Sequence, residues 1–206
     1  MSYVIQKQTY ADGQAYRYHV LDENGRLRYV AEPTGRMLPS PTRLVEFFDP
    51  DHKRVGRVQP ADVAPWRRAE QYEIFIGQET ESPRATIMER WRLVDILLLR
   101  LPRYVVHLGK YRYVARGSRY GGRFYQIFRL CEREEGETDE EEPSESDGGG
   151  TEEGEEEAQA SEIEVGQIER PVAGPSYLVE TDAAPLRQTP MVLAALIILM
   201  DMELYD

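Results

Sequence analysis

Ten consecutive residues near the C-terminal end of the chain, Met191–Met200, carry no polar side chain. Thr189 and Pro190 come directly before them, and an N-cap residue followed by proline is typical of the start of a helix. A helix that is apolar on every side belongs either in a membrane or in the centre of a protein. Ten residues rise only about 15 Å, which is half of a hydrocarbon core. We therefore predict a buried central helix over residues 189–205, around which the rest of the chain folds.

Most of the chain before residue 131 alternates apolar and polar side chains with a period of two. The alternation is clear in Tyr72–Ile76 and in Tyr104–Leu108, and it is typical of half-buried strands rich in aromatic and β-branched residues. Turn signals separate these runs, and Asn24-Gly25 is the strongest hairpin signal among them. The pattern predicts twelve strands, near residues 3–10, 15–21, 26–31, 43–48, 53–59, 70–76, 84–90, 103–108, 111–116, 123–130, 162–169 and 175–181.

Twelve evenly spaced strands followed by one apolar helix indicate a mainly β fold. Such spacing favours a closed antiparallel sheet or a sandwich. Closure removes exposed strand edges, but a twelve-stranded barrel is wide enough to need something inside it. The apolar helix would supply that filling. We therefore expect residues 1–206 to form one domain, a twelve-stranded antiparallel barrel that encloses a hydrophobic C-terminal α-helix.

The net charge of −12 is very unevenly distributed. Residues 132–162 hold 16 acidic residues and one arginine, which leaves 21 acidic and 24 basic residues elsewhere. The segment 132–161 is rich in Glu, Ser and Gly and has no aromatic residue, so it cannot bury enough apolar surface to order itself. We expect a disordered acidic insertion within the domain. It could bind a basic protein, although such runs are usually only solvated spacers.

No sequence motif of a known catalytic or metal centre is present. The chain has no Walker A motif, no GxSxG, no HExxH and no GxGxxG before a helix. The histidines His19, His52 and His107 have no Cys or His at ligand spacing. We expect no catalytic residue, metal or cofactor, and hence no enzyme. The single cysteine, Cys131, and a start at residues 1–10 without an apolar signal-peptide core predict a cytoplasmic protein.

A run of basic residues interleaved with tyrosines begins at residue 110. Its candidate ligand-binding residues are Lys110, Arg112, Arg116, Arg119 and Arg123, and a second, weaker candidate is the pair Arg67 and Arg68. Such groups could hold anionic lipid head groups or nucleic-acid phosphates, and an ordinary solvated barrel face is the alternative. We expect a lipid surface rather than a nucleic acid as the partner.

The segment Trp91–Leu101 does not follow the strand rhythm and is predicted to form a short amphipathic helix or an apolar loop. It has more large apolar residues than one helical face can bury, so the barrel, a partner or lipid must cover the excess. Arginines flank the segment, which suits an anionic interface. The segment is either a lid over a barrel mouth or a membrane-contacting element, and the side chains concerned are Trp91, Leu93, Leu97 and Leu98.

The C-terminal region has a recognisable order of features. The strand Ser176–Glu180, followed by Asp182 and by an apolar helix that ends in Asp201-Met202-Glu203, resembles the LURP-one-related proteins. These belong to the superfamily of tubby C-terminal domains and phospholipid scramblases. The resemblance covers nearly the whole chain except 132–161 and implies a twelve-stranded barrel around a hydrophobic C-terminal helix. Scramblases carry an acidic calcium-binding stretch before this helix, whereas Thr181–Leu186 has one carboxylate, so the resemblance implies no calcium site here.

The expected function follows from the basic run, the apolar segment 91–101 and the resemblance. We expect a non-enzymatic, monomeric barrel that binds lipid and associates peripherally with an anionic phospholipid surface. The alternative is a soluble protein-interaction module that uses the acidic insertion and has no lipid role. A small-ligand carrier fits less well, because the central helix occupies the space that a ligand would need.

Overall fold

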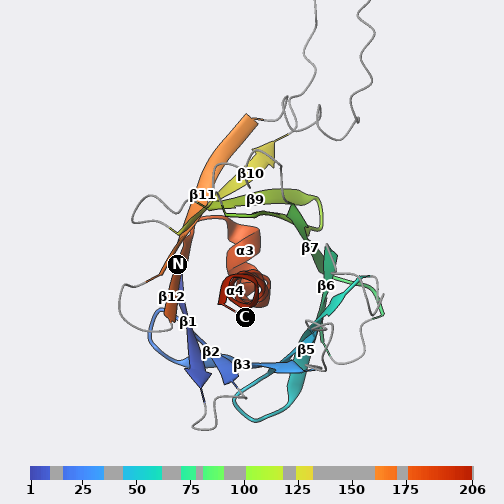
Figure 1. Ribbon diagram of the computed structural model, residues 1–206, viewed down its shortest axis with the longest axis vertical. Helices are drawn as coiled ribbons and strands as arrows, with labels where there is room; N and C mark the ends of the chain where they lie inside the picture. Colours follow the sequence, from blue (N-terminus) through green and yellow to red (C-terminus); the bar gives the residue numbers. More distant parts are fainter. Residues whose placement is uncertain are drawn as a thin grey trace, which may run out of the picture.

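The computed structural model describes residues 1–9, 16–34, 44–61, 71–77, 81–90, 101–117, 124–131, 161–170 and 176–205. Twelve antiparallel strands close into a barrel, in which β12 pairs with β1 and every other strand pairs with its neighbours in sequence. Figure 1 looks down this barrel and shows α4 end-on at its centre. The fold is the one that the sequence predicts.

The predicted strands all appear, with ends shifted by a few residues. They are β1 (Ser2–Thr9), β2 (Tyr16–Leu21), β3 (Leu27–Thr34), β4 (Leu44–Phe48), β5 (Arg54–Pro60), β6 (Gln71–Ile76), β7 (Ala85–Arg90), β8 (Arg103–Leu108), β9 (Tyr111–Gly117), β10 (Tyr125–Cys131), β11 (Ser161–Glu169) and β12 (Ser176–Thr181). Two helices follow, α3 (Ala184–Gln188) and α4 (Pro190–Tyr205).

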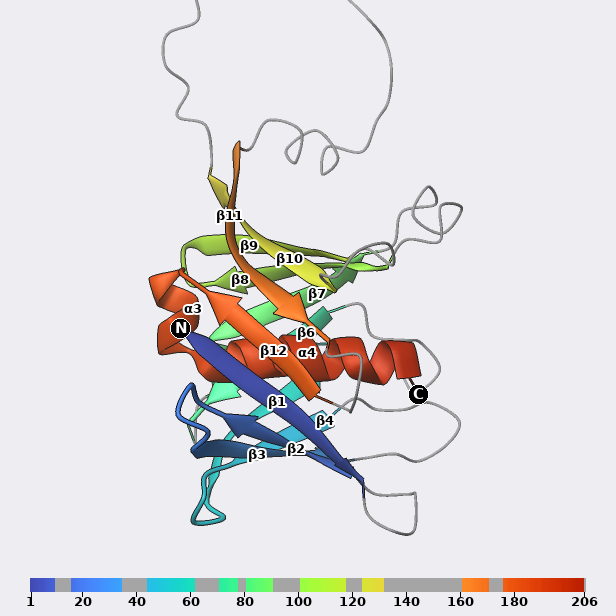
Figure 2. The ribbon, with the colours of Figure 1, turned by 90° about the vertical axis from the view of Figure 1, so that its left-hand side faces the viewer.

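The helix α4 lies inside the barrel and forms the centre of the core. Its residues from Met191 to Met202 are all between 0% and 4% exposed. Figure 2 shows the helix crossing the barrel from one mouth to the other, with α3 beside its N-terminal end. A helix with no polar face needs apolar neighbours on every side, and a closed ring of inward-facing strand residues provides them. Gly56 of β5 leaves room for Met191, because a Cβ there would lie 2.6 Å from the backbone oxygen of Phe75 and overlap the Met191 side chain.

The hairpin predicted at Asn24-Gly25 joins β2 to β3. Gly25 has φ +70°, a conformation that costs glycine little and other residues more. The Asp22 carboxylate accepts hydrogen bonds of 2.9 Å from the backbone N–H groups of Asn24 and Arg26. This side chain therefore fixes the turn, which is the usual role of aspartate at such a position.

The start of α4 differs from the sequence prediction in one respect. Thr189 precedes Pro190 as expected, but its hydroxyl donates a 2.7 Å hydrogen bond to the carbonyl oxygen of Pro185 rather than capping α4. The hydroxyl is used this way because the short helix α3, which the sequence analysis did not predict, ends at Gln188 directly before it. The two helices therefore meet at a sharp turn at one mouth of the barrel.

Several sequence predictions concern residues outside the described ranges. The acidic insertion falls at 132–160, and Ser161, its predicted last residue, is instead the first residue of β11. The segment 91–100 also lies outside the described ranges. Leu101 is described, is 5% exposed and packs in the core. In the part of the chain that the structure describes, no helix is both long and apolar enough to cross a membrane.

Candidate functional site

The outward surface of β7, β8, β9 and β10 carries an unusual concentration of positive charge. Along these strands the inward side chains pack on α4, and alternate residues face outward. The outward residues with ionisable side chains are Arg90, Arg103, His107, Arg112 and Arg116, which we call the outer basic face. No outward residue of these four strands, all within the described ranges, is acidic. The charged side chains that these four strands themselves turn outward are therefore all basic.

The strand register brings like charges together on this face. Arg90 of β7 lies opposite Arg103 of β8, and the imidazole of His107 on β8 lies opposite Arg112 of β9. Two like charges directly opposite one another on a sheet, such as Arg90 and Arg103, are destabilising. On the other side of the barrel, Arg17 of β2 forms an ion pair of 2.7 Å with Glu32, and Arg54 of β5 forms one of 3.2 Å with Glu46.

The pKa of the His107 imidazole is affected by its burial and by this local charge. Burial lowers the pKa of its imidazole, and the nearby guanidinium groups of Arg112 and Arg90 lower it further, because each disfavours a second positive charge. Its Nε2 atom is buried and has no hydrogen-bond partner within the described ranges. Burial, which is the larger cause, and the two guanidinium groups therefore both favour the neutral form of the imidazole.

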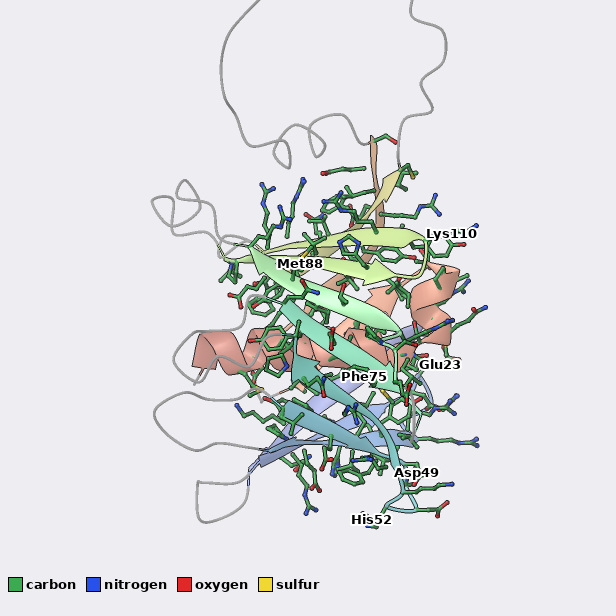
Figure 3. All side chains as sticks on the ribbon, turned by 90° about the vertical axis from the view of Figure 1, so that its right-hand side faces the viewer. Glu23, Asp49, His52, Phe75, Met88 and Lys110 are labelled. Atoms are coloured by element: carbon green, nitrogen blue, oxygen red, sulfur yellow. The ribbon has the colours of Figure 1, made fainter. Side chains whose placement is uncertain are left out.

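An apolar row crosses the middle of the outer basic face. Met88, Val105, Val114 and Phe128 are successive cross-strand neighbours on β7 to β10. Val105 is 1% exposed and Val114 is 2% exposed, although both point away from the barrel interior. Figure 3 shows Met88 on this side of the barrel, with Lys110 in the turn at one end of it. The row is covered at its centre, so contacts made by this face come from the charged groups at its borders.

The sequence-predicted basic run contributes to this face only in part. Arg112 and Arg116 lie on it, whereas Lys110 lies in the exposed β8–β9 turn with its Nζ 5.5 Å from the centre of the Tyr111 ring. The remaining candidates lie outside the described ranges: Arg67, Arg68, Arg119, Arg123, Trp91, Leu93, Leu97 and Leu98. Arg90, Arg103 and His107 are not part of the local run. The sequence analysis singled out Arg90 and Arg103 only as arginines that flank the segment 91–101, and the pairing of β7, β8 and β9 places them on the same face as Arg112.

Arg116 marks the border of the outer basic face with β11. Its guanidinium group forms a two-pronged ion pair with the carboxylate of Glu162, in which Nη1 lies 2.7 Å from Oε2 and Nη2 contacts Oε1. The guanidinium carbon also lies 5.5 Å from the centre of the Phe128 ring. The geometry is well matched, since a guanidinium and a carboxylate present parallel donors and acceptors.

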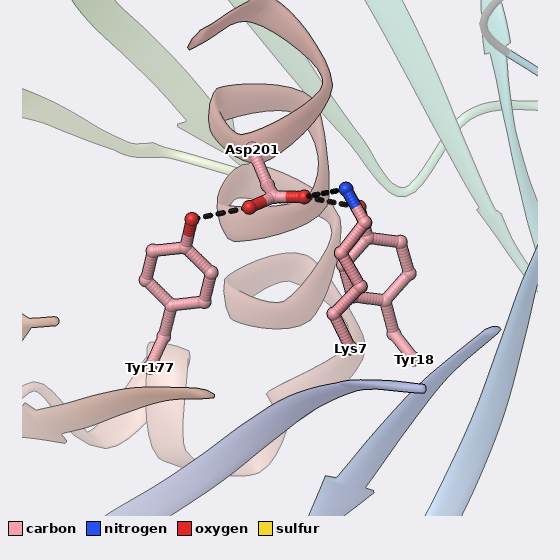
Figure 4. Close-up of polar contacts among 4 residues, drawn as sticks. All are labelled: Lys7, Tyr18, Tyr177 and Asp201. Atoms are coloured by element: carbon pink, nitrogen blue, oxygen red, sulfur yellow. Dashed lines mark hydrogen bonds and ion pairs between the residues drawn. The ribbon is translucent and has the colours of Figure 1, made fainter. Parts of the chain in front are cut away.

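A second polar feature lies inside the barrel, at the C-terminal end of α4. Asp201 is 3% exposed and accepts hydrogen bonds from Tyr18 (2.6 Å) and Tyr177, and its Oδ2 lies 2.7 Å from the Lys7 ammonium. Figure 4 shows the three side chains converging on this carboxylate. Burial raises the pKa of the Tyr177 hydroxyl, and the hydrogen bond to Asp201 raises it further. We call these four residues the Asp201 cluster.

The Asp201 cluster holds the helix in place rather than offering a site to a ligand. Its partners come from β1, β2 and β12, so the carboxylate joins the helix end to three adjacent strands. A buried carboxylate needs such donors, because an uncompensated buried charge is very costly. Both of its oxygens already have partners from the barrel strands.

The histidines that the sequence analysis set aside occur in separate places. His19 is on β2, His52 is in the β4–β5 turn with φ +60°, and His107 is on β8. Within the described ranges, no group of three or more His, Cys, Asp or Glu side chains is arranged to hold a metal ion.

Comparisons with known proteins extend the description of the fold. No protein-family model matches the chain, and no curated protein matches it either. The X-ray structure of a protein from Arabidopsis thaliana is similar, with a TM-score of 0.50 and 13% sequence identity. The similarity covers 98% of this chain and 90% of the plant protein. At this identity it shows a shared fold, which extends over nearly the whole length of both chains.

Proposed function

We propose that this protein is a non-enzymatic barrel that associates peripherally with anionic phospholipid surfaces through the outer basic face. The observation that carries the proposal is the register of β7–β9, which places Arg90 directly opposite Arg103 and brings Arg112 onto the same face. Two like charges opposite one another destabilise the sheet, and an anionic surface bound next to them would offset that loss of stability. The resemblance to LURP-one-related proteins of the tubby and scramblase superfamily, supported by the shared barrel architecture, agrees with a role at lipids.

The mode of binding follows from which groups the face exposes. Because Val105 and Val114 are covered, the attraction is electrostatic and does not depend on inserting apolar side chains. Each basic residue near an anionic membrane contributes about 1 kcal/mol, and this contribution falls off within a Debye length. The association should therefore be reversible and should weaken steeply when the salt concentration rises.

Vesicle co-sedimentation tests this proposal. The full chain is mixed with phosphatidylcholine vesicles, with or without phosphatidylserine, at about 0.1 M and about 1 M salt. We expect binding only with phosphatidylserine and only at the lower salt concentration. The double variant Arg103→Gln with Arg112→Gln should reduce the partition coefficient about 30-fold, which corresponds to about 2 kcal/mol.

The matched control removes two positive charges elsewhere. Arg26 and Lys53 are exposed residues of the β2–β3 and β4–β5 turns. The variant Arg26→Gln with Lys53→Gln has the same net charge as the test variant and should keep most of the binding. A thermal melt of each variant separates loss of binding from loss of fold. Equal loss in both variants, or binding that ignores salt, contradicts the proposal.

A further inference from the structure

The strand β11 is longer than the partner on one of its two sides. It pairs with β10 from Ser161 to Ile168, but it pairs with β12 only from Gly166 to Glu169. The carbonyl oxygen of Val165 accepts a 2.9 Å hydrogen bond from the N–H of Asp182, and there the ladder with β12 ends. Figure 2 shows β11 continuing past β12. Residues 161–163 therefore have an edge with no strand beside it in the described part of the chain, and we call it the β11 edge.

The β11 edge is accessible and held in strand conformation. All three of its residues are exposed, and Ile163, at 46%, is among the few large apolar side chains that are. Glu162 pairs with Arg116 of β9, which fixes this end of the strand against the sheet. An ordered strand with unpaired N–H and C=O groups is a template for another strand. Three residues offer about 10 Å of such an edge.

An acidic cavity lies where β11 separates from β12. Its volume is about 570 Å³, and its lining includes the carboxylates of Glu23, Glu164, Glu180 and Asp182. No lysine or arginine lines it, and the amino group of Met1, 3.5 Å from the carbonyl oxygen of Thr181, is its one positively charged group among the described residues. A chain that continued along the β11 edge toward β12 would reach this cavity.

We propose that the β11 edge binds an extended, lysine- or arginine-bearing segment of a partner protein as an added strand. The backbone of the segment pairs with residues 161–163, and a basic side chain enters the acidic cavity next to Asp182 and Glu180. In strand addition, backbone hydrogen bonds supply affinity and side-chain pockets supply specificity. Because the lining of the cavity is acidic, it favours a positively charged side chain of the partner segment over a negatively charged one. The proposal does not depend on lipid binding by the outer basic face.

A second copy of this chain fits the edge poorly. Antiparallel pairing of two β11 edges brings Glu162 and Glu164 of one copy against the same glutamates of the other. Like charges opposite one another destabilise a sheet, whereas opposite charges stabilise it. The two glutamates thus protect the edge from self-pairing and leave it open to a basic strand.

Three matched peptides provide the test with the full chain. The probe is a labelled ten-residue peptide in which lysine alternates with valine and threonine. The second peptide has the same side chains but carries backbone N-methyl groups at alternate residues, so it keeps the charge and loses the strand hydrogen bonds. The third has glutamate in place of lysine. We expect the first peptide to bind, the second to bind at least about ten-fold more weakly, and the third not to bind.

Amide chemical shifts of the full chain locate the binding. The first peptide should move the amide signals of Ser161–Val165 and of Thr181 and Asp182. Absence of binding, equal affinity for the N-methylated peptide, or shifts confined to the acidic segment 132–160 would each overturn the proposal. So would a dimer in sedimentation velocity that the peptide does not dissociate, because it would show that the edge pairs with itself.

A charge variant tests the role of the cavity. Glu180→Gln with Asp182→Asn should weaken binding of the first peptide about five-fold, as expected for the loss of two opposite-charge contacts. Both side chains are exposed, and glutamine at 180 can still accept the 2.9 Å hydrogen bond from Gln167. The matched control, Asp51→Asn with Glu81→Gln, removes two exposed carboxylates elsewhere and should leave the affinity unchanged. Equal weakening in both variants would show general charge attraction and would overturn the assignment to this cavity.

Discussion

Replacing Lys7 with methionine should destabilise the protein strongly, because it removes the cation from the Asp201 cluster. The side chains of Lys7 and Asp201 are 13% and 5% exposed, so water compensates the remaining carboxylate only slightly. Breaking a buried ion pair by removing one partner costs about 3–5 kcal/mol. Tyr18 and Tyr177 still donate to Asp201 in this variant. We therefore expect the lower end of that range, about 3 kcal/mol.

Urea unfolding at neutral pH, followed by far-UV circular dichroism, measures this loss as the change in unfolding free energy. Tyr18→Phe removes one hydrogen bond to a charged group and should cost about 1.5–3 kcal/mol. The double variant Lys7→Met with Asp201→Asn removes both charges but keeps a side chain that can hydrogen-bond with Tyr18 and Tyr177, and it should be more stable than Lys7→Met alone. Lys53→Met, in an exposed turn, should change the free energy by less than about 0.5 kcal/mol.

The reasoning fails if Lys7→Met costs less than about 1 kcal/mol, because the carboxylate would then not depend on its cation. It also fails if the double variant is no more stable than Lys7→Met alone. That outcome would mean that the unpaired charge of Asp201 is not the cause of the loss in Lys7→Met.

Three further predictions concern the core, the acidic insertion and pH. Leu196→Asp should abolish cooperative thermal unfolding, since it places an unpaired charge at a position 2% exposed inside the barrel; a sharp melt near that of the parent would contradict the central role of α4. Deleting residues 133–160 leaves 23 acidic and 24 basic residues, so the isoelectric point should become basic. The melting temperature should stay nearly constant, since loop length has a small entropic effect, and a large fall would show that the insertion packs on the barrel. The lowered pKa of His107 favours its neutral form in the folded state, a contribution that is complete above about pH 6.5 and is lost as the pH falls through the folded-state pKa. The unfolding free energy should therefore fall between about pH 7 and pH 5, and His107→Gln should flatten this dependence while the exposed-turn control His52→Gln does not; parallel curves for parent and His107→Gln would exclude the effect.

The architecture of this protein is readable from its sequence because each layer imposes a local pattern. A strand whose inner side packs on α4 must place apolar residues at every second position, as Tyr72, Ile74 and Ile76 do on β6. A helix surrounded by strands must be apolar on all sides, as Met191–Met200 is. Neither pattern depends on distant residues. The short helix α3 was missed because five residues that include a proline carry no such periodic pattern.

The Asp201 cluster could not be predicted in the same way. Lys7 and Tyr18 are 194 and 183 residues from Asp201 in the sequence, and only closure of the barrel through the β1–β12 pairing brings them together. Two signals were available locally. Asp201 is a charged residue continuing an apolar helix, and Lys7 occupies the inward alternation of Tyr3 and Ile5 on β1. Each of these two residues is charged at a position that the apolar pattern assigns to the core, and the ion pair between them explains why a charge is tolerated at either position.

The outer basic face was found only where its residues are close in sequence. Arg112 and Arg116 belong to one strand and were visible as a run, whereas Arg90 and Arg103 required the register of β7 with β8. An alternating pattern gives the face on which a residue lies but not its neighbour on the next strand. Clusters that cross strands therefore emerge only from pairing.

The filled interior determines where this protein can meet its partners. Since α4 occupies the barrel and is at most 4% exposed from Met191 to Met202, binding without displacing the helix must occur on the outer surface. On the outer surface, the basic and acidic groups lie in different regions. The outer basic face is on β7–β10, and the acidic cavity lies between β11 and β12. Arg116 and Glu162 pair across the border between the two regions. An ion pair at the surface contributes at most about 1 kcal/mol, so it couples the two regions only weakly. An anionic vesicle and a basic peptide should therefore bind together rather than compete.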